Sequence, residues 1–155
     1  VVVITGGDNA LYTKLGKRSW FFPIQVKNYV TNISDWMISA DLLITKAGGL
    51  ILSEGLAAGL PIVLINNLPG QEEGNVRYIL ENNAGIQAST PAELIPIMNS
   101  WLSDGQSNLN TIKNNSRRLG HPSAALSVSE SLWQATSSSA VSGPFTQPEI
   151  VGYLE

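Results

Sequence analysis

Short apolar runs alternate with amphipathic segments over the first ninety positions of the chain. The runs are rich in β-branched residues and stop at glycine, proline or polar residues, which is typical of strands. Those at 41–45 and 61–65 are almost wholly apolar, as expected of strands buried on both faces. The pattern predicts strands at residues 1–5, 24–30, 41–45 and 61–65 and a minor edge strand at 85–87.

The segments between these runs have the apolar spacing of helices. Gly59 ends the helix predicted over 50–58, and Pro61 then begins the fourth strand. The pattern predicts short helices at residues 10–15, 33–39, 50–58 and 75–81, and longer ones at 91–102, 109–119 and 122–133.

Strands that alternate with helices predict the fold class α/β, with a Rossmann-like parallel sheet covered by helices on both faces. We place this domain at residues 1–135 and a serine-rich, mobile tail at 136–155. The chain begins at Val1, inside an apolar run, and ends in Leu154–Glu155, a pair often left by a cloning site. We therefore expect a piece of a longer protein. For the last two residues a natural ending is the commoner case, and a cloning remnant is the alternative.

Composition narrows the function classes. Lysine and arginine total 9 against 12 for aspartate and glutamate, which gives a net charge of −3. This balance argues against a nucleic-acid partner and against a strong pull toward anionic membranes. Cysteine is absent, so disulfides and thiolate metal sites are excluded. We expect no metal and no cofactor.

A glycine turn follows the third predicted strand. Lys46, Ala47, Gly48 and Gly49 lie between that strand and the next helix. In open α/β sheets, ligands bind at the carboxyl ends of strands, where helix N-termini offer free N–H groups. A diphosphate suits this place, although the glycines alone are equally consistent with a tight turn. The pattern is neither a P-loop nor the dinucleotide fingerprint.

Glu54 lies on the helix after this turn. Ile51, Leu52, Gly55 and Leu56 form its core-facing stripe, and Glu54 falls outside that stripe. It stands about 7 Å along the axis from the glycines, at 1.5 Å per residue. A carboxylate there is placed to accept hydrogen bonds from ribose hydroxyls. The alternative is an ordinary solvated glutamate.

The loop after the fourth strand contains Gln71, Glu72 and Asn75. Amide and carboxylate groups suit the recognition of sugar hydroxyls, which need both donors and acceptors. Out of context, an ordinary polar turn introduced by Pro69–Gly70 would be the simpler reading.

In combination, the stretch TKAGGLILSEGLAAGLPIVLINNLPGQEEGN resembles the donor-site segment of GT-B glycosyltransferases. These include monogalactosyldiacylglycerol synthases, processive diacylglycerol glucosyltransferases and, more distantly, the peptidoglycan GlcNAc transferase. The likeness covers residues 1–132. It implies a UDP-sugar donor. The diphosphate would contact Ala47, Gly48 and Gly49, and the ribose would contact Glu54. The sugar would contact Gln71, Glu72 and Asn75, and the uracil would contact the backbone of Tyr29 and Val30.

The chain departs from this family at two places. Ile51 stands where relatives usually have threonine. Gly6–Asn9 matches the end of the family's second strand, so the first strand, its diphosphate loop and the whole acceptor domain are expected to be missing. The strands on either side of the gap would then keep unpaired edges, which favours self-association into a homodimer. No catalytic residue is expected in this chain, which we predict to be inactive alone.

The resemblance implies the donor-binding domain of a hexosyltransferase that acts on a lipid or another hydroxyl acceptor. Contact with a membrane would come only through the absent domain, and the location would be the cytoplasm or the cytoplasmic membrane face. Two alternatives stay open: a non-catalytic nucleotide-sugar-binding module, and a UDP-GlcNAc epimerase. The epimerase needs carboxylates and a histidine at the sugar, whereas the lone His121 fits a cap or a surface role.

Overall fold

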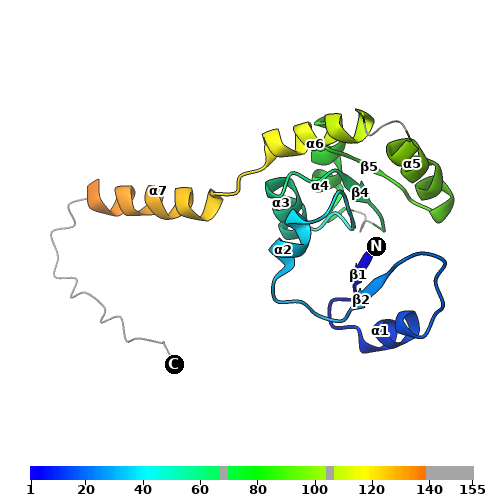
Figure 1. Cartoon of the computed structure of the whole chain (residues 1–155). Coiled ribbons are helices and arrows are strands. Elements are labelled where there is room, and N and C mark those ends of the chain that lie inside the picture. The colour runs from blue at the N-terminus through cyan, green and yellow to red at the C-terminus, as the bar shows by residue number, and fades with distance from the viewer. Residues whose placement is uncertain (67–69, 104–106, 139–155) are drawn as a thin grey trace, which may run out of the picture. The chain divides into compact units, whose positions relative to one another are not determined.

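The computed structural model describes residues 1–66, 70–103 and 107–138. The chain divides into two units, Val1–Pro122 and Ser123–Glu155. The described elements of the first unit are β1 (Val2–Ile4), α1 (Asn9–Gly16), β2 (Gln25–Lys27), α2 (Ile33–Ile38), β3 (Leu43–Thr45), α3 (Gly49–Ala57), β4 (Ile62–Leu64), α4 (Glu73–Glu81), β5 (Gly85–Gln87), α5 (Pro91–Ser103) and α6 (Ser107–Leu119) (Figure 1). Helix α7 (Ala124–Ser138) is the described part of the second unit.

The strand pairs of the described residues are all parallel. Val3 of β1 lies opposite Val26 of β2. Val63 of β4 lies between Ile44 of β3 and Ile86 of β5. Because parallel neighbours need crossover connections, helices separate the strands in sequence. The predicted α/β class is confirmed.

The strands form two sheets, of order β1–β2 and β3–β4–β5. On one edge of β1, the Gln25 N–H donates to the Val1 carbonyl at 2.9 Å. Backbone groups of successive strand residues turn to opposite edges, so those of Val2 and Ile4 face away from β2. Within the described residues, no strand pairs with that edge of β1 or with the edge of β3 that faces away from β4.

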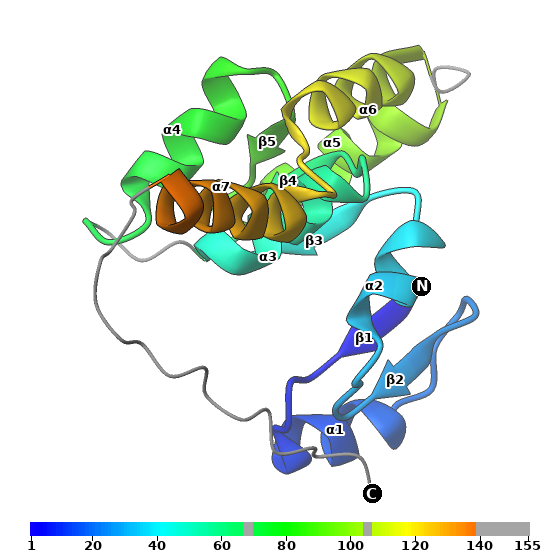
Figure 2. The same ribbon diagram turned by 90° about the vertical axis from the view of Figure 1, so that its left-hand side faces the viewer.

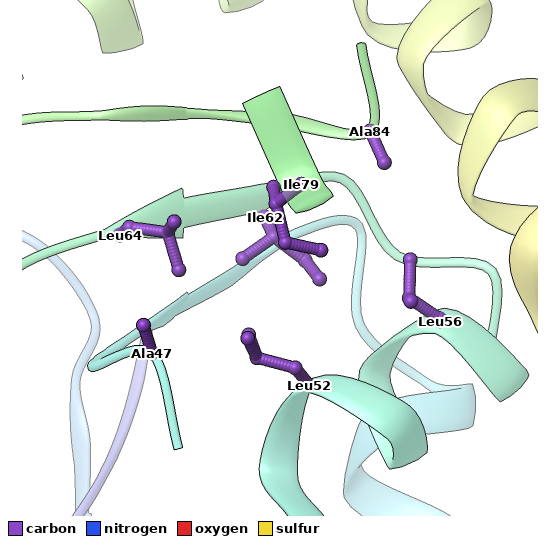
Figure 3. Packing of buried hydrophobic residues seen from close by; sticks show 7 residues of the cluster. All are labelled: Ala47, Leu52, Leu56, Ile62, Leu64, Ile79 and Ala84. Atoms are coloured by element: carbon purple, nitrogen blue, oxygen red, sulfur yellow. The ribbon is translucent and has the colours of Figure 1, made fainter. Parts of the chain in front are cut away.

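Strand β4 is the centre of the core, and its residues are fully buried. Ile62 and Leu64 point to one face, where they cluster with Leu52 and Leu56 of α3 and with Ile79 of α4 (Figure 3). The period of two along a strand sends alternate side chains to opposite faces. This face therefore holds the sheet against the helix that follows the glycine turn.

Val63 points to the other face of β4. It clusters there with Ala88, with Trp101 of α5 and with Leu109 of α6. Figure 1 shows β4 and β5 between α3 and α5, in agreement with these clusters. Trp101 is thus a core residue.

The first strand differs from its prediction. A short β-branched run such as that at 1–5 is typical of a buried strand, yet Val1 is 73% and Val2 42% exposed. Figure 2 shows β1 beside β2, with α1 following β1. Helix α1 contains no buried residue. Among the described residues the run has one strand neighbour and no tightly packed helix, which accounts for its exposure.

Several predicted boundaries are close to the observed ones. Helix α3 reaches its C-cap at Ala58, and Gly59 follows with a φ of +71°. Helix α4 begins at Glu73, two residues before its expected start, and α7 continues to Ser138. The expectations for the tail beyond Ser138, including Leu154–Glu155, lie outside the described residues. Within the described part, no helix has the length and apolar character needed to cross a membrane.

Candidate functional site

The turn from β3 into α3 places a helix N-terminus at the carboxyl end of a central strand. Gly48 is the N-cap residue, with extended backbone, and its carbonyl accepts from the Leu52 N–H at 3.1 Å. As a glycine, Gly48 has no side chain with which to cap this end. The first N–H groups of a helix lack intrahelical partners and carry partial positive charge. The α3 N-terminus is therefore suited to an anion.

Neither glycine of the turn is required by local packing. Gly48 has a φ of −66°, which any residue adopts. A Cβ at Gly48 would make only ordinary contacts, the nearest at 3.6 Å to Ile51, and one at Gly49 would lie 3.7 Å from the Asn75 amide nitrogen. Packing within the described part of the chain therefore does not account for the two glycines.

The start of α4 is tied to this turn by two polar contacts. Asn75 Nδ2 donates to the Ala47 carbonyl at 2.8 Å. Lys46 Nζ lies 3.5 Å from Glu72 Oε1; the Lys46 side chain is 60% exposed, whereas that of Glu72 is 7% exposed. The predicted phosphate turn and the predicted sugar loop are thus brought together. Sequence reasoning missed both contacts, because neither pairing has a local sequence signal.

Glu54 is half-buried on α3, while Leu52, Gly55 and Leu56 face the core. Its placement away from the buried face agrees with the predicted stripe. In the described part of the chain, its carboxylate accepts no hydrogen bond and forms no ion pair. An acceptor of this kind, one and a half turns beyond an open helix N-terminus, can bind hydroxyl groups.

Gln71 is exposed, directly before the buried Glu72. Gly70 has a φ of +81°, and its N–H donates to Glu73 Oε1 at 2.9 Å. Residues 67–69 of the same loop are outside the described ranges.

Tyr29 and Val30 follow the carboxyl end of β2, in the other sheet. Tyr29 is 72% exposed and Val30 is half-buried. Within the described ranges, no hydrogen bond or ion pair joins them to the β3–α3 turn.

A polar network that the sequence analysis missed holds the segment before Tyr29. Asn28 Nδ2 donates to Asn9 Oδ1 at 2.6 Å, and Thr5 Oγ1 donates to Asn28 Oδ1 at 3.1 Å. The network joins the carboxyl ends of β1 and β2, where parallel α/β sheets bind ligands. The available signal was the polar segment Gly6–Asn9 after the first predicted strand and the polar Asn28 within the second.

The other groups to place are a possible metal site and the lone histidine. No group of three or more histidine, aspartate or glutamate side chains there is arranged to hold a metal ion. His121 is exposed and follows α6.

Comparison with known proteins identifies the family. Residues 1–128 match the family model described as "Glycosyltransferase family 28 C-terminal domain". The chain is 35% identical over 128 residues to monogalactosyldiacylglycerol synthase 3, chloroplastic, of Arabidopsis thaliana, a match that covers 83% of this chain and 28% of that protein. It is 36% identical to a probable chloroplastic monogalactosyldiacylglycerol synthase of Nicotiana tabacum, again over 83% of this chain and over 24% of the relative. The chain thus spans about a quarter of the length of these relatives.

Solved structures agree with this assignment. MurG from Acinetobacter baumannii superposes with a TM-score of 0.70 at 18% identity, over 86% of this chain and 41% of MurG. WaaG, a glycosyltransferase involved in lipopolysaccharide biosynthesis, gives a TM-score of 0.53 at 25% identity, over 76% of this chain and 32% of WaaG. The predicted fold, that of the C-terminal domain of a GT-B glycosyltransferase, is confirmed. The chain belongs to the glycosyltransferase family 28 C-terminal domain family.

Proposed function

We propose that this chain holds the UDP-sugar donor of a hexosyltransferase at the carboxyl ends of its strands. The observation that carries the proposal is the N-terminus of α3, where the N-cap Gly48 has no capping side chain of its own, with two glycines that the packing of the described residues does not require and with Glu54 further along the same helix. Such a helix end binds a diphosphate through backbone N–H groups and the helix dipole.

Lys46 adds a mobile charge to this anion site. It is mostly exposed, and its partner Glu72 is buried beside the turn. An incoming diphosphate would compete with Glu72 for the Lys46 ammonium. Glu72 and Gln71 are the residues proposed to contact the sugar.

Asn75 already donates to the Ala47 carbonyl. Its amide oxygen is the group proposed to accept from a sugar hydroxyl. In this arrangement Asn75 contacts the sugar and also fixes α4 against the phosphate turn. Glu54 would accept from the ribose hydroxyls.

The uracil would lie against the backbone of Tyr29 and Val30. The hydrogen bonds among Thr5, Asn9 and Asn28 support this assignment, because they fix the backbone directly before Tyr29. Fixed backbone donors and acceptors favour recognition of a base edge.

In the proposed reaction, an acceptor hydroxyl oxygen attacks C1 of the sugar. The C1–oxygen bond to the acceptor forms, the C1–oxygen bond to the diphosphate breaks, and UDP departs with the bonding electrons. The hydroxyl proton passes to a base in a part of the enzyme outside this chain. The α3 N-terminus and Lys46 stabilise the charge on the departing diphosphate.

The acceptor is proposed to be a diacylglycerol-type lipid, because relatives at 35% and 36% identity are named as monogalactosyldiacylglycerol synthases. The names of these relatives include "chloroplastic". A cytoplasmic location, or one on the cytoplasmic membrane face, stays a prediction for this chain.

Calorimetric titration of the chain with UDP, UMP and ADP tests the donor site. We expect UDP to bind most tightly, since it alone offers both the uracil and the diphosphate. Equal affinities for UDP and ADP would contradict the uracil assignment, and equal affinities for UDP and UMP would contradict the diphosphate assignment. The chain alone should transfer no sugar from a UDP-hexose to diacylglycerol, as thin-layer chromatography of the lipid products would show.

A further inference from the structure

The connection between α1 and β2 has a charge unlike that of the whole chain. Residues 9–34 contain Lys14, Lys17, Arg18 and Lys27 and no aspartate or glutamate, although the chain has a net charge of −3. Lys14, Lys17 and Arg18 are exposed, and in the described part of the chain none of them forms an ion pair. This segment therefore presents a local positive surface.

The same connection exposes aromatic side chains in an ordered loop. Trp20 Nε1 donates to the Leu15 carbonyl at 3.2 Å, which ties the loop to the end of α1. The Arg18 guanidinium stacks 4.8 Å from the centre of the Trp20 ring, and the Phe22 ring lies 5.9 Å from it. Figure 1 shows this connection as a loop that extends outward between α1 and β2.

Phe21 is held outward by this arrangement. Trp20 and Phe22 pack on each other, and Phe21 between them has a relative exposure of 108%, which is that of a side chain without neighbours. Such a residue contributes no packing to the fold. An ordered loop that projects one fully exposed phenylalanine beside exposed cations points to a partner that is both apolar and anionic.

We infer that Trp20, Phe21 and Phe22, together with Lys14, Lys17 and Arg18, form a docking surface for an anionic lipid bilayer. Tryptophan favours the level of the lipid headgroups, phenylalanine enters the acyl region, and lysine and arginine attract anionic headgroups. Fluid lipid accepts a convex apolar tip without a preformed pocket. A protein partner would need a matching pocket, and single-stranded nucleic acid would need a flat stacking platform.

The position of this surface leaves the proposed donor site open. The aromatic loop leads into the amino end of β2 at Gln25, whereas Tyr29 and Val30 follow its carboxyl end. Membrane contact and nucleotide binding would thus use opposite ends of the strand. The inference does not depend on the proposed function, and it places a membrane contact within this chain itself.

Co-sedimentation of the 155-residue chain with lipid vesicles tests the inference. We expect binding to vesicles of phosphatidylcholine mixed with phosphatidylglycerol, weak binding to phosphatidylcholine alone, and loss of binding as salt is raised. Phe21→Ser should weaken binding at least about tenfold. Ile95→Ser, which removes a 61% exposed apolar side chain from α5, is the matched control and should bind like the wild type.

A charge pair sharpens the test. Lys17→Gln should lower vesicle affinity about fivefold, since one cation near an anionic surface contributes about that factor. Arg118→Gln removes an exposed cation from α6 and should change nothing. Circular dichroism will show that all four variants are folded. Absence of wild-type binding to the phosphatidylglycerol vesicles, or equal binding by the Phe21→Ser and Ile95→Ser variants, would overturn the inference and favour a protein partner.

Discussion

Val63 of β4 and Val3 of β1 are each the middle residue of a three-residue parallel strand, yet their surroundings differ. Val63 has strand partners on both sides and is fully buried, whereas Val3 has one strand partner and is half-buried. No residue from 1 to 36 is buried. A strand of apolar residues becomes core only when neighbouring strands and helices cover both of its edges and both of its faces.

The largest difference in stability between the β3–β4–β5 region and the β1–β2 region should appear when a methyl group is added at a glycine. A Cβ at Gly85 of β5 would lie 2.2 Å from the Ile62 carbonyl oxygen and 2.8 Å from Ile79 Cγ2. Because a backbone atom must move, Gly85→Ala should destabilise the fold by about 3 kcal/mol or more. Gly16→Ala in α1 meets nothing within 4 Å and should leave stability unchanged or slightly raised. Thermal unfolding measures both, and a similar melting temperature for the two variants would refute the contrast.

Truncating an apolar side chain should lower the free energy of unfolding more in β4 than in β1. Ile62→Ala deletes a fully buried side chain of β4 and should lower the free energy of unfolding by about 2–5 kcal/mol. Val2→Ala, in the exposed β1, should cost less than about 1 kcal/mol. Urea titration followed by circular dichroism gives both values. Equal shifts of the two midpoints would mean that β1 is covered in solution.

A substitution at Glu54 tests whether α3, in the well-packed β3–β4–β5 region, binds the ribose. Glu54→Ala removes the carboxylate proposed to bind the ribose, and hydrogen bonds to a charged group contribute about 1.5–3 kcal/mol each. UDP should therefore bind at least about tenfold more weakly. Glu81→Ala, at the far end of α4, is the control and should bind UDP normally. If both variants bound equally well, Glu54 would be a solvated surface residue.

The edge of β1 that faces away from β2, which no described strand covers, should have the smallest effect, and one that depends on protein concentration. We propose that the chain self-associates through this edge, because exposed strand edges pair with other chains. Val2→Pro removes an N–H that faces away from β2 and should restore the monomer, since proline is tolerated at strand edges. Static light scattering at several concentrations measures the mass. A wild-type chain that stays monomeric throughout would exclude this association.

The order of elements in the β3–β4–β5 region was predictable from the sequence, because its signals are local. The run of apolar residues in β4 and the stop at Gly59 set these elements within a residue or two. The exposure of β1 could not be read in the same way. It depends on which strands lie beside it, and the residues of β1 do not contain that information.

The candidate site likewise has features that the sequence predicts and features that it does not. Parallel strands put their carboxyl ends at one edge, so the sequence placed Gly48, Gly49 and the loop before α4 near one another. The contact of Lys46 with Glu72 and that of Asn75 with Ala47 could not be predicted. They depend on the point at which α4 begins and on side-chain conformations, which have no period in the sequence.

The most direct test of the donor site is a titration of the isotope-labelled chain with UDP, followed by amide chemical shifts in NMR spectra. The account predicts the largest changes at Gly48, Gly49 and Glu54, with smaller ones at Asn75 and Val30. The amides of α5, whose Trp101 packs on the Val63 face of the sheet, should not move. Shifts confined to α5, or no shifts at saturating UDP, would contradict the proposal that α3 begins at a nucleotide-sugar site.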